Sequence, residues 1–123
     1  MGLTSVWKNE LNSEMHIDAV DEDGTISGTY HSLVGKDPRI EKLTGRTHAP
    51  REGEKQMLSF SVCYEIADPE SGSGHFSTCA WSGWLKPGNP DTIQTFWILT
   101  SSKLDTKDEW SSHLMGTNVF ERQ

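Results

Sequence analysis

The chain has 123 residues, a formal net charge of −7 and a sequence pI near 5.1. A chain of this length is expected to form one domain with a single core, which we place at residues 1–123. The acidic balance argues against nucleic acid and an anionic membrane surface as partners, and no apolar run reaches the roughly 18 residues that a membrane-spanning helix needs.

Short runs rich in strand-forming residues follow one another along the chain, separated by turn signals. The expected strands are residues 5–11, 14–20, 25–31, 40–47, 57–65, 75–85, 92–101 and 110–121. In the fifth run Leu58, Phe60 and Val62 alternate with other residues, as in a strand with one buried face. This pattern predicts an all-β fold, an eight-stranded antiparallel up-and-down β-barrel, because closing the sheet removes its exposed edges.

Three features that could suggest a metal site or a disulfide are interpreted as neither. The acidic run Asp21-Glu22-Asp23-Gly24 is expected to be a hairpin turn, since it lacks the downstream glutamate of a calcium loop. The five histidines lack the spacing of metal ligands. Cys63 is expected to point outward and Cys79 inward, and a disulfide between them would distort the backbone. We therefore expect no metal site and two free thiols.

Uncharged polar residues occur on strand faces that a barrel would normally keep apolar. One such face comprises Trp7, Asn9, Leu11 and Ser13, in the first expected strand and directly after it. The other comprises Tyr30, Ser32 and Val34, at the third expected strand and the loop after it. An unpaired buried amide or hydroxyl costs about 1–3 kcal/mol, so an interior face of this kind needs hydrogen-bond partners. A bound ligand is the partner that these faces predict.

Six motifs, in order along nearly the whole chain, resemble the avidin and streptavidin family of biotin-binding barrels. They are W-x-N-x-L-x-S at residues 7–13, G-T-Y-x-S-x-V-G at 28–35, L-T-G-R at 43–46, W-S-G at 81–83, Q-T-F-W-I-L-T-S at 94–101 and W-x-S-x-L-x-G-x-x-x-F at 110–120. The resemblance implies non-catalytic, high-affinity binding of biotin at the mouth of the barrel, without a cofactor.

The resemblance also implies a role for each site residue. Asn9, Ser13 and Tyr30 match three donors to the ureido oxygen of biotin, and Ser32 and Asn118 match acceptors for its N–H groups. The remaining implied biotin contacts are Leu11, Val34, Gly35, Lys36, Tyr64, Ser77, Cys79, Trp81, Trp97 and Leu99. Three of them depart from the family pattern, because Tyr64, Cys79 and Lys36 stand where streptavidin-like members carry Trp, Thr and Asn.

The resemblance further implies a homotetramer. Trp110 matches a residue that reaches into the ligand site of a neighbouring subunit, and Phe96 and Met115 are expected to face outward.

Several alternatives remain open at this stage. A lipocalin-like carrier of another small apolar ligand is the main rival, although it predicts an interior without Asn9, Ser13, Ser32 and Asn118. A structural or interaction module predicts exposed apolar patches, and an enzyme is disfavoured because no nucleophile has a histidine partner at a motif spacing. The compartment is not determined: no signal peptide precedes the first expected strand, the resemblance suggests a secreted protein, and a cytoplasmic one remains possible.

Overall fold

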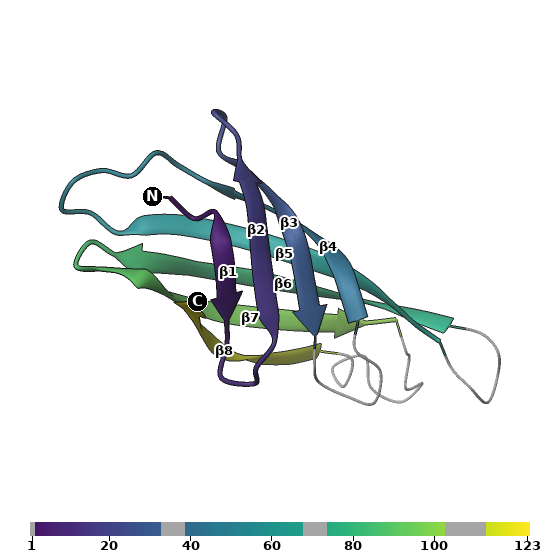
Figure 1. Cartoon of the computed structure of the whole chain (residues 1–123). Coiled ribbons are helices and arrows are strands. Elements are labelled where there is room, and N and C mark those ends of the chain that lie inside the picture. The colour runs from purple at the N-terminus through teal and green to yellow at the C-terminus, as the bar shows by residue number, and fades with distance from the viewer. Residues whose placement is uncertain (1, 33–38, 68–73, 103–112) are drawn as a thin grey trace.

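The computed structural model describes residues 2–32, 39–67, 74–102 and 113–123. These residues form eight strands in a closed barrel, in which each strand pairs antiparallel with the next and β1 pairs with β8 (Figure 1). The strands are β1 (Ser5–Lys8), β2 (Glu14–Val20), β3 (Thr25–Ser32), β4 (Arg39–Thr47), β5 (Gln56–Ala67), β6 (Gly74–Lys86), β7 (Asn89–Ser101) and β8 (His113–Arg122). The all-β, eight-stranded antiparallel barrel is therefore confirmed. The described residues include no helix with the length and apolar character needed to cross a bilayer.

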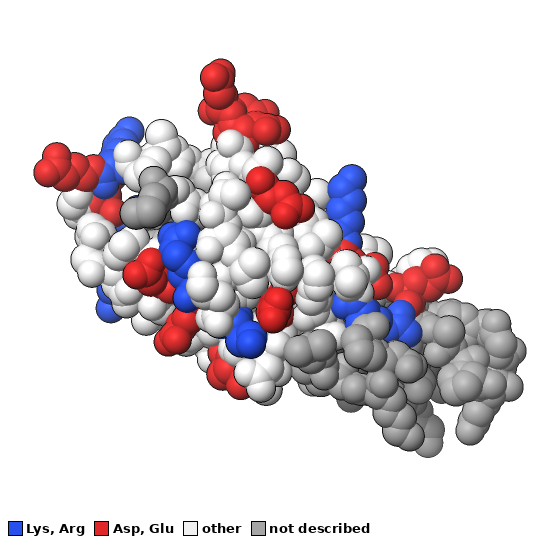
Figure 2. Space-filling model, viewed as in Figure 1, with Lys and Arg blue, Asp and Glu red and all other residues white. Residues whose placement is uncertain are grey.

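All eight expected strands agree with the observed ones to within three residues at each end. The bounds of β2 agree completely, and β5, β6 and β7 are each longer than expected. Gly24 has a φ of 88°, as expected for the hairpin turn between β2 and β3. That turn projects from the barrel and carries the acidic side chains at the top of Figure 2.

The first strand is the main correction. The sequence pattern predicts a strand that continues to residue 11, but β1 ends at Lys8 and the chain then turns. Leu11, predicted as an apolar contact with the ligand, is 58% exposed rather than directed into the barrel. In this part of the chain, inward-facing and outward-facing residues therefore alternate only as far as Lys8, where β1 ends.

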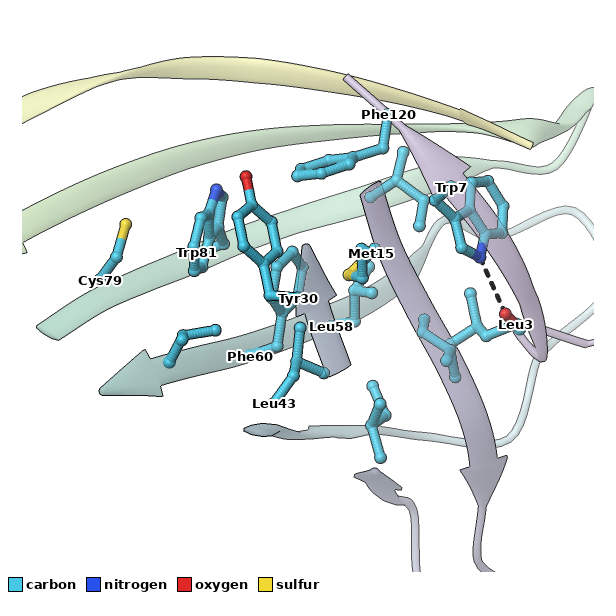
Figure 3. Packing of buried hydrophobic residues seen from close by; sticks show 14 of the residues in the cluster. Leu3, Trp7, Met15, Tyr30, Leu43, Leu58, Phe60, Cys79, Trp81 and Phe120 are labelled. Atoms are coloured by element: carbon cyan, nitrogen blue, oxygen red, sulfur yellow. Dashed lines mark hydrogen bonds between the residues drawn. The ribbon is translucent and has the colours of Figure 1, made fainter. Parts of the chain in front are cut away.

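Large apolar side chains fill the barrel around Trp7, which is completely buried (Figure 3). The Trp7 indole N–H donates to the Leu3 carbonyl at 2.9 Å, so its polar atom is satisfied inside the core. The Arg122 guanidinium lies over the same ring, 4.4 Å from its centroid. The N-terminal segment and the end of β8 thereby cover the same end of the barrel, opposite the end where β1 stops and β2 starts.

One close backbone approach in this wall requires glycine. A Cβ on Gly28 in β3 would stand 1.8 Å from the His16 carbonyl oxygen in β2. The approach lies beside an irregularity in the pairing of β2 with β3, between Ile17 and Ala19. Backbone atoms cannot move aside as a flexible side chain would, so any larger residue must separate the two strands.

We predict that Gly28→Ala lowers the free energy of unfolding by at least about 2 kcal/mol, as overpacking of a fixed backbone does. Gly88→Ala is the matched control, because a Cβ there meets nothing within 4 Å. It should stay within about 0.5 kcal/mol of the wild type. Urea unfolding followed by tryptophan fluorescence measures both values. Equal stability of the two variants would contradict the close approach.

Candidate functional site

Five polar residues are buried in the described part of the barrel. They are Asn9, Ser13, Ser77, Thr95 and Asn118. Asn9 directly follows β1, Ser13 directly precedes β2 and Ser77 is near the start of β6, so these three belong to the same end of the barrel. The sequence analysis predicts four of the five as site residues, and Thr95 is the exception.

A tight turn between β1 and β2 positions the first two. The Asn12 amide donates to the Asn9 carbonyl at 3.0 Å, with Asn12 in the left-handed region at a φ of 64°. Asn9 Oδ1 accepts from the backbone amides of Leu11 at 3.0 Å and Ser13 at 3.1 Å. Because the side-chain oxygen is held by backbone donors, the Nδ2 group is left to point elsewhere. This capping ends the strand earlier than alternation alone predicts.

The three predicted donors come together at this turn. Asn9 Nδ2 donates to the Tyr30 hydroxyl at 3.3 Å, and the same hydroxyl hydrogen-bonds the Ser13 side chain. Burial is the main cause that raises the pKa of Tyr30 to about 12. Tyr30 is therefore protonated at neutral pH and carries a hydroxyl hydrogen that it can donate.

Aromatic rings lie beside this polar cluster. Trp81 stacks on Phe60 with ring centroids 4.9 Å apart, and its centroid is 5.1 Å from that of Tyr30 (Figure 3). Tyr64, Trp97 and Leu99 are partly buried and pack against the core cluster. Four of the predicted ligand contacts, Tyr64, Trp81, Trp97 and Leu99, therefore lie on β5, β6 and β7.

The position of the Trp97 ring depends on a glycine in β8 that the sequence analysis did not select. A Cβ on Gly116, its cross-strand partner in β8, would stand 2.6 Å from the Trp97 ring. The missing side chain at position 116 lets the indole lie against the backbone of β8.

Asn118 is held by two partners of opposite polarity. Its Oδ1 accepts from the Trp81 indole N–H at 3.0 Å, and its Nδ2 donates to Glu10 Oε1 at 2.7 Å. Glu10 Oε2 also accepts from the Val119 amide at 3.0 Å. Partial burial pushes the pKa of Glu10 upward, but the bonds from Asn118 and Val119 outweigh it and hold the pKa below its ordinary value of 4.5.

Glu10 is one of two polar residues in this region that sequence reasoning missed. In a continuous strand it would point away from the face of Asn9, so alternation gave no reason to select it. Thr95 was missed as well, and its hydroxyl donates to the Asn118 carbonyl at 2.9 Å, which is a structural bond between β7 and β8.

The two cysteines lie as predicted. Cys79 is buried, Cys63 is exposed, and both are free thiols. Burial raises the pKa of Cys79 to about 12, so its thiol is protonated at neutral pH. Ser77, two residues before Cys79 on β6, is also buried and inward, and Ser32 at the end of β3 is half-buried.

Four predicted site residues fall outside the described residues. They are Val34, Gly35, Lys36 and Trp110. The outward positions of Phe96 and Met115 are confirmed, at 59% and 75% exposed. Among the residues described, no group of three or more His, Cys, Asp and Glu side chains could hold a metal ion.

Comparison with known proteins adds an independent line of information. A family model described as the avidin family matches residues 1–123. Avidin of Gallus gallus is 27% identical over 125 residues, which cover 98% of this chain and 77% of that protein. Avidin-related proteins 7 and 2 of the same organism are each 28% identical over 124 residues, with the same coverage.

The buried acids of the site predict a loss of stability at alkaline pH. Burial raises the pKa of Tyr30 from 10.0 to about 12, that of Cys79 from 9.0 to about 12, and that of Tyr64 as well. The unfolded chain therefore releases these protons at lower pH than the folded chain, and stability present below about pH 9 is lost as the pH rises toward about 12.

Tyr30→Phe should reduce this loss by about 1–1.5 kcal/mol at pH 11, because that pH lies midway between the ordinary pKa of 10.0 and the raised pKa of about 12. Urea unfolding near pH 8 and near pH 11 measures the difference. If the variant and the wild type lose the same stability over that interval, Tyr30 does not carry the effect.

Proposed function

Because this chain belongs to the avidin family, we propose that it binds biotin, without catalysing a reaction, among the inward-facing residues at the end of the barrel where β1 stops. The observation that carries the proposal is the buried cluster in which Asn9 and Ser13 both hydrogen-bond the Tyr30 hydroxyl. Three neighbouring donor groups suit a single strong acceptor that replaces the hydrogen bonds among them, and the ureido oxygen of biotin is such an acceptor. In a water-poor interior these hydrogen bonds are electrostatically stronger than in water.

Asn9 and Tyr30 are already in a donor state without the ligand. Asn9 cannot turn its amide around without losing the two backbone bonds to its oxygen. Tyr30 is protonated far above neutral pH. Preorganised donors of this kind reduce the cost of ordering on binding, which is a main determinant of affinity.

The other faces of the ligand have candidate partners too. Ser32 and Asn118 Oδ1 supply acceptors for the two ureido N–H groups. Trp81, Trp97 and Tyr64 supply aromatic surface for the bicyclic ring. Ser77 lies on β6 for the carboxylate tail, with Cys79 nearer the ring sulfur. Val34, Gly35, Lys36 and Trp110 stay predictions.

A lipocalin-like carrier of an apolar ligand is the less favoured function. It predicts an interior lined by apolar side chains alone. The four buried polar residues other than Thr95 support a ligand with polar atoms of its own instead.

We also propose that a second copy of this chain covers the outer face of β7 and β8, within a homotetramer. Phe96, Ile98 and Met115 are exposed there and lie around a hollow of about 550 Å³ that no charged side chain lines. Contiguous exposed apolar surface marks interaction sites. Because each subunit carries a net charge of −7, an uncharged face is where two copies meet with least repulsion.

Calorimetric titration with biotin tests the proposed function, and we expect saturation at about one biotin per subunit. Asn9→Asp should weaken binding at least about tenfold, because it replaces the Nδ2 donor by an acceptor. The variant keeps the oxygen that caps the turn. Where binding is too tight for calorimetry, the dissociation rate measures the same effect.

Asn89→Asp is the control for this titration, since the same change is made at an exposed position at the other end of the barrel. A folded wild-type protein that gives no heat and no change in tryptophan fluorescence would reject biotin as the ligand. Equal affinity of Asn9→Asp and the wild type would reject the ureido assignment alone.

For the assembly, we predict that Met115→Glu lowers the molar mass measured by light scattering from that of a tetramer to a smaller species. The introduced carboxylate would be desolvated in the apolar contact. Ile40→Glu, at an exposed apolar position on β4, should leave the mass unchanged. A monomeric wild type, or equal masses for all three proteins, would contradict this interface.

A further inference from the structure

The side-chain amide of Asn118 has only one orientation that satisfies its neighbours. The Trp81 indole can only donate a hydrogen bond, and the ionised Glu10 carboxylate can only accept one. Oδ1 therefore faces Trp81 at 3.0 Å and Nδ2 faces Glu10 at 2.7 Å. The reversed amide would place two donors together at one end and two acceptors together at the other.

Glu10 reaches Asn118 because β1 leaves the sheet early. The pairing of β1 with β8 covers only Trp7 with Arg122 and Lys8 with Glu121. Beyond that point Glu10 Oε2 accepts the Val119 amide at 3.0 Å, in the place of a further backbone partner. The Glu10 carboxylate thus accepts hydrogen bonds from the Val119 backbone amide and from the side chain of Asn118, the residue before it in β8.

We propose that Glu10 is a positioning residue that locks the Asn118 amide with its oxygen toward the ligand, so that this point of the site accepts N–H donors and rejects acceptors. The identity of the ligand rests on the proposed function. The lock itself rests on the three hydrogen bonds. Asn118 Oδ1 keeps one lone pair beyond the bond to Trp81, and that lone pair is available for a ligand N–H.

The carboxylate also strengthens the acceptor that it orients. A negative charge on the Nδ2 side polarises the amide and increases the partial charge on Oδ1, as in a chain of hydrogen bonds. A neutral amide in contact with ligand thereby gains part of the acceptor strength of a carboxylate. A ligand with an oxygen or sulfur acceptor in place of that N–H would leave two acceptors facing each other, which disfavours binding.

A purely structural role is the competing explanation. In that case Glu10 would only close the barrel wall through Val119, and changes at position 118 would act independently of changes at position 10. The positioning role and the structural role predict different results when the hydrogen-bond donor is moved from position 118 to position 10 and the acceptor from position 10 to position 118.

The test therefore uses Glu10→Gln, Asn118→Asp and the double variant. Glu10→Gln alone cannot accept from both Asn118 and Val119 with separate oxygens, and Asn118→Asp alone sets two carboxylates at hydrogen-bond distance. Each single change should weaken biotin binding at least about tenfold at pH 8.

The double variant exchanges the polarity of the pair and restores its hydrogen bonds. The glutamine introduced at position 10 donates to the aspartate introduced at position 118 and still accepts from Val119. The introduced aspartate still accepts from Trp81. Binding should therefore return to within about threefold of the wild type or become tighter.

Thermal unfolding of the wild type, the two single variants and the double variant, all without biotin, tests the coupling between positions 10 and 118 independently of binding. The double variant should be more stable than the sum of the single changes predicts. Glu22→Gln, which removes the same charge in the exposed hairpin turn, should resemble the wild type in both measurements.

Additive effects in binding and in unfolding would overturn the lock and leave Glu10 with a structural role. Recovery of stability without recovery of biotin affinity would overturn the selection of the ligand at this point. If the wild type binds no biotin, the proposed function fails, and the unfolding comparison alone decides whether the lock exists.

Discussion

Closure of the barrel between β1 and β8 is the constraint on which the rest of the structure depends. Only two residue pairs join these strands, because β1 ends at Lys8. The turn that follows brings Asn9 and Ser13 inward and places Glu10 against β8. The polar cluster therefore lies where the backbone ladder is incomplete and side chains supply the missing hydrogen bonds.

The interior is divided between apolar packing and polar groups. Around Trp7 the barrel is filled by side chains that are almost completely buried, and the one polar atom of that indole is satisfied by Leu3. At the other end, Asn9 and Ser13 hydrogen-bond the Tyr30 hydroxyl, the first over a long 3.3 Å, and Asn118 bonds Trp81 and Glu10. A small barrel holds a ligand only where side chains leave the interior incompletely filled, and polar groups there decide which ligand is accepted.

Sequence reasoning predicted the strands with a clear two-residue period, such as β5, since burial of one face imposes that period. It selected Asn9, Ser13 and Tyr30 from polar residues on expected strand faces and from the family motifs. It was wrong for Leu11, because an asparagine side chain competes locally with the strand ladder and ends it. Glu10 was missed, since its position depends on that turn and on a partner 108 residues away in sequence. No local pattern records such a contact.

In the pair formed by Glu10 and Asn118, the charged group and the group proposed to contact the ligand are on different residues. A carboxylate placed directly inside the barrel would lose much of its hydration, and that cost is large unless every lone pair finds a donor. Glu10 is instead exposed and ionised at neutral pH, and its hydrogen bonds hold its pKa below the ordinary value of 4.5. Only the neutral amide of Asn118 is buried. The chain therefore polarises a buried acceptor from the rim of the barrel without burying the charge itself.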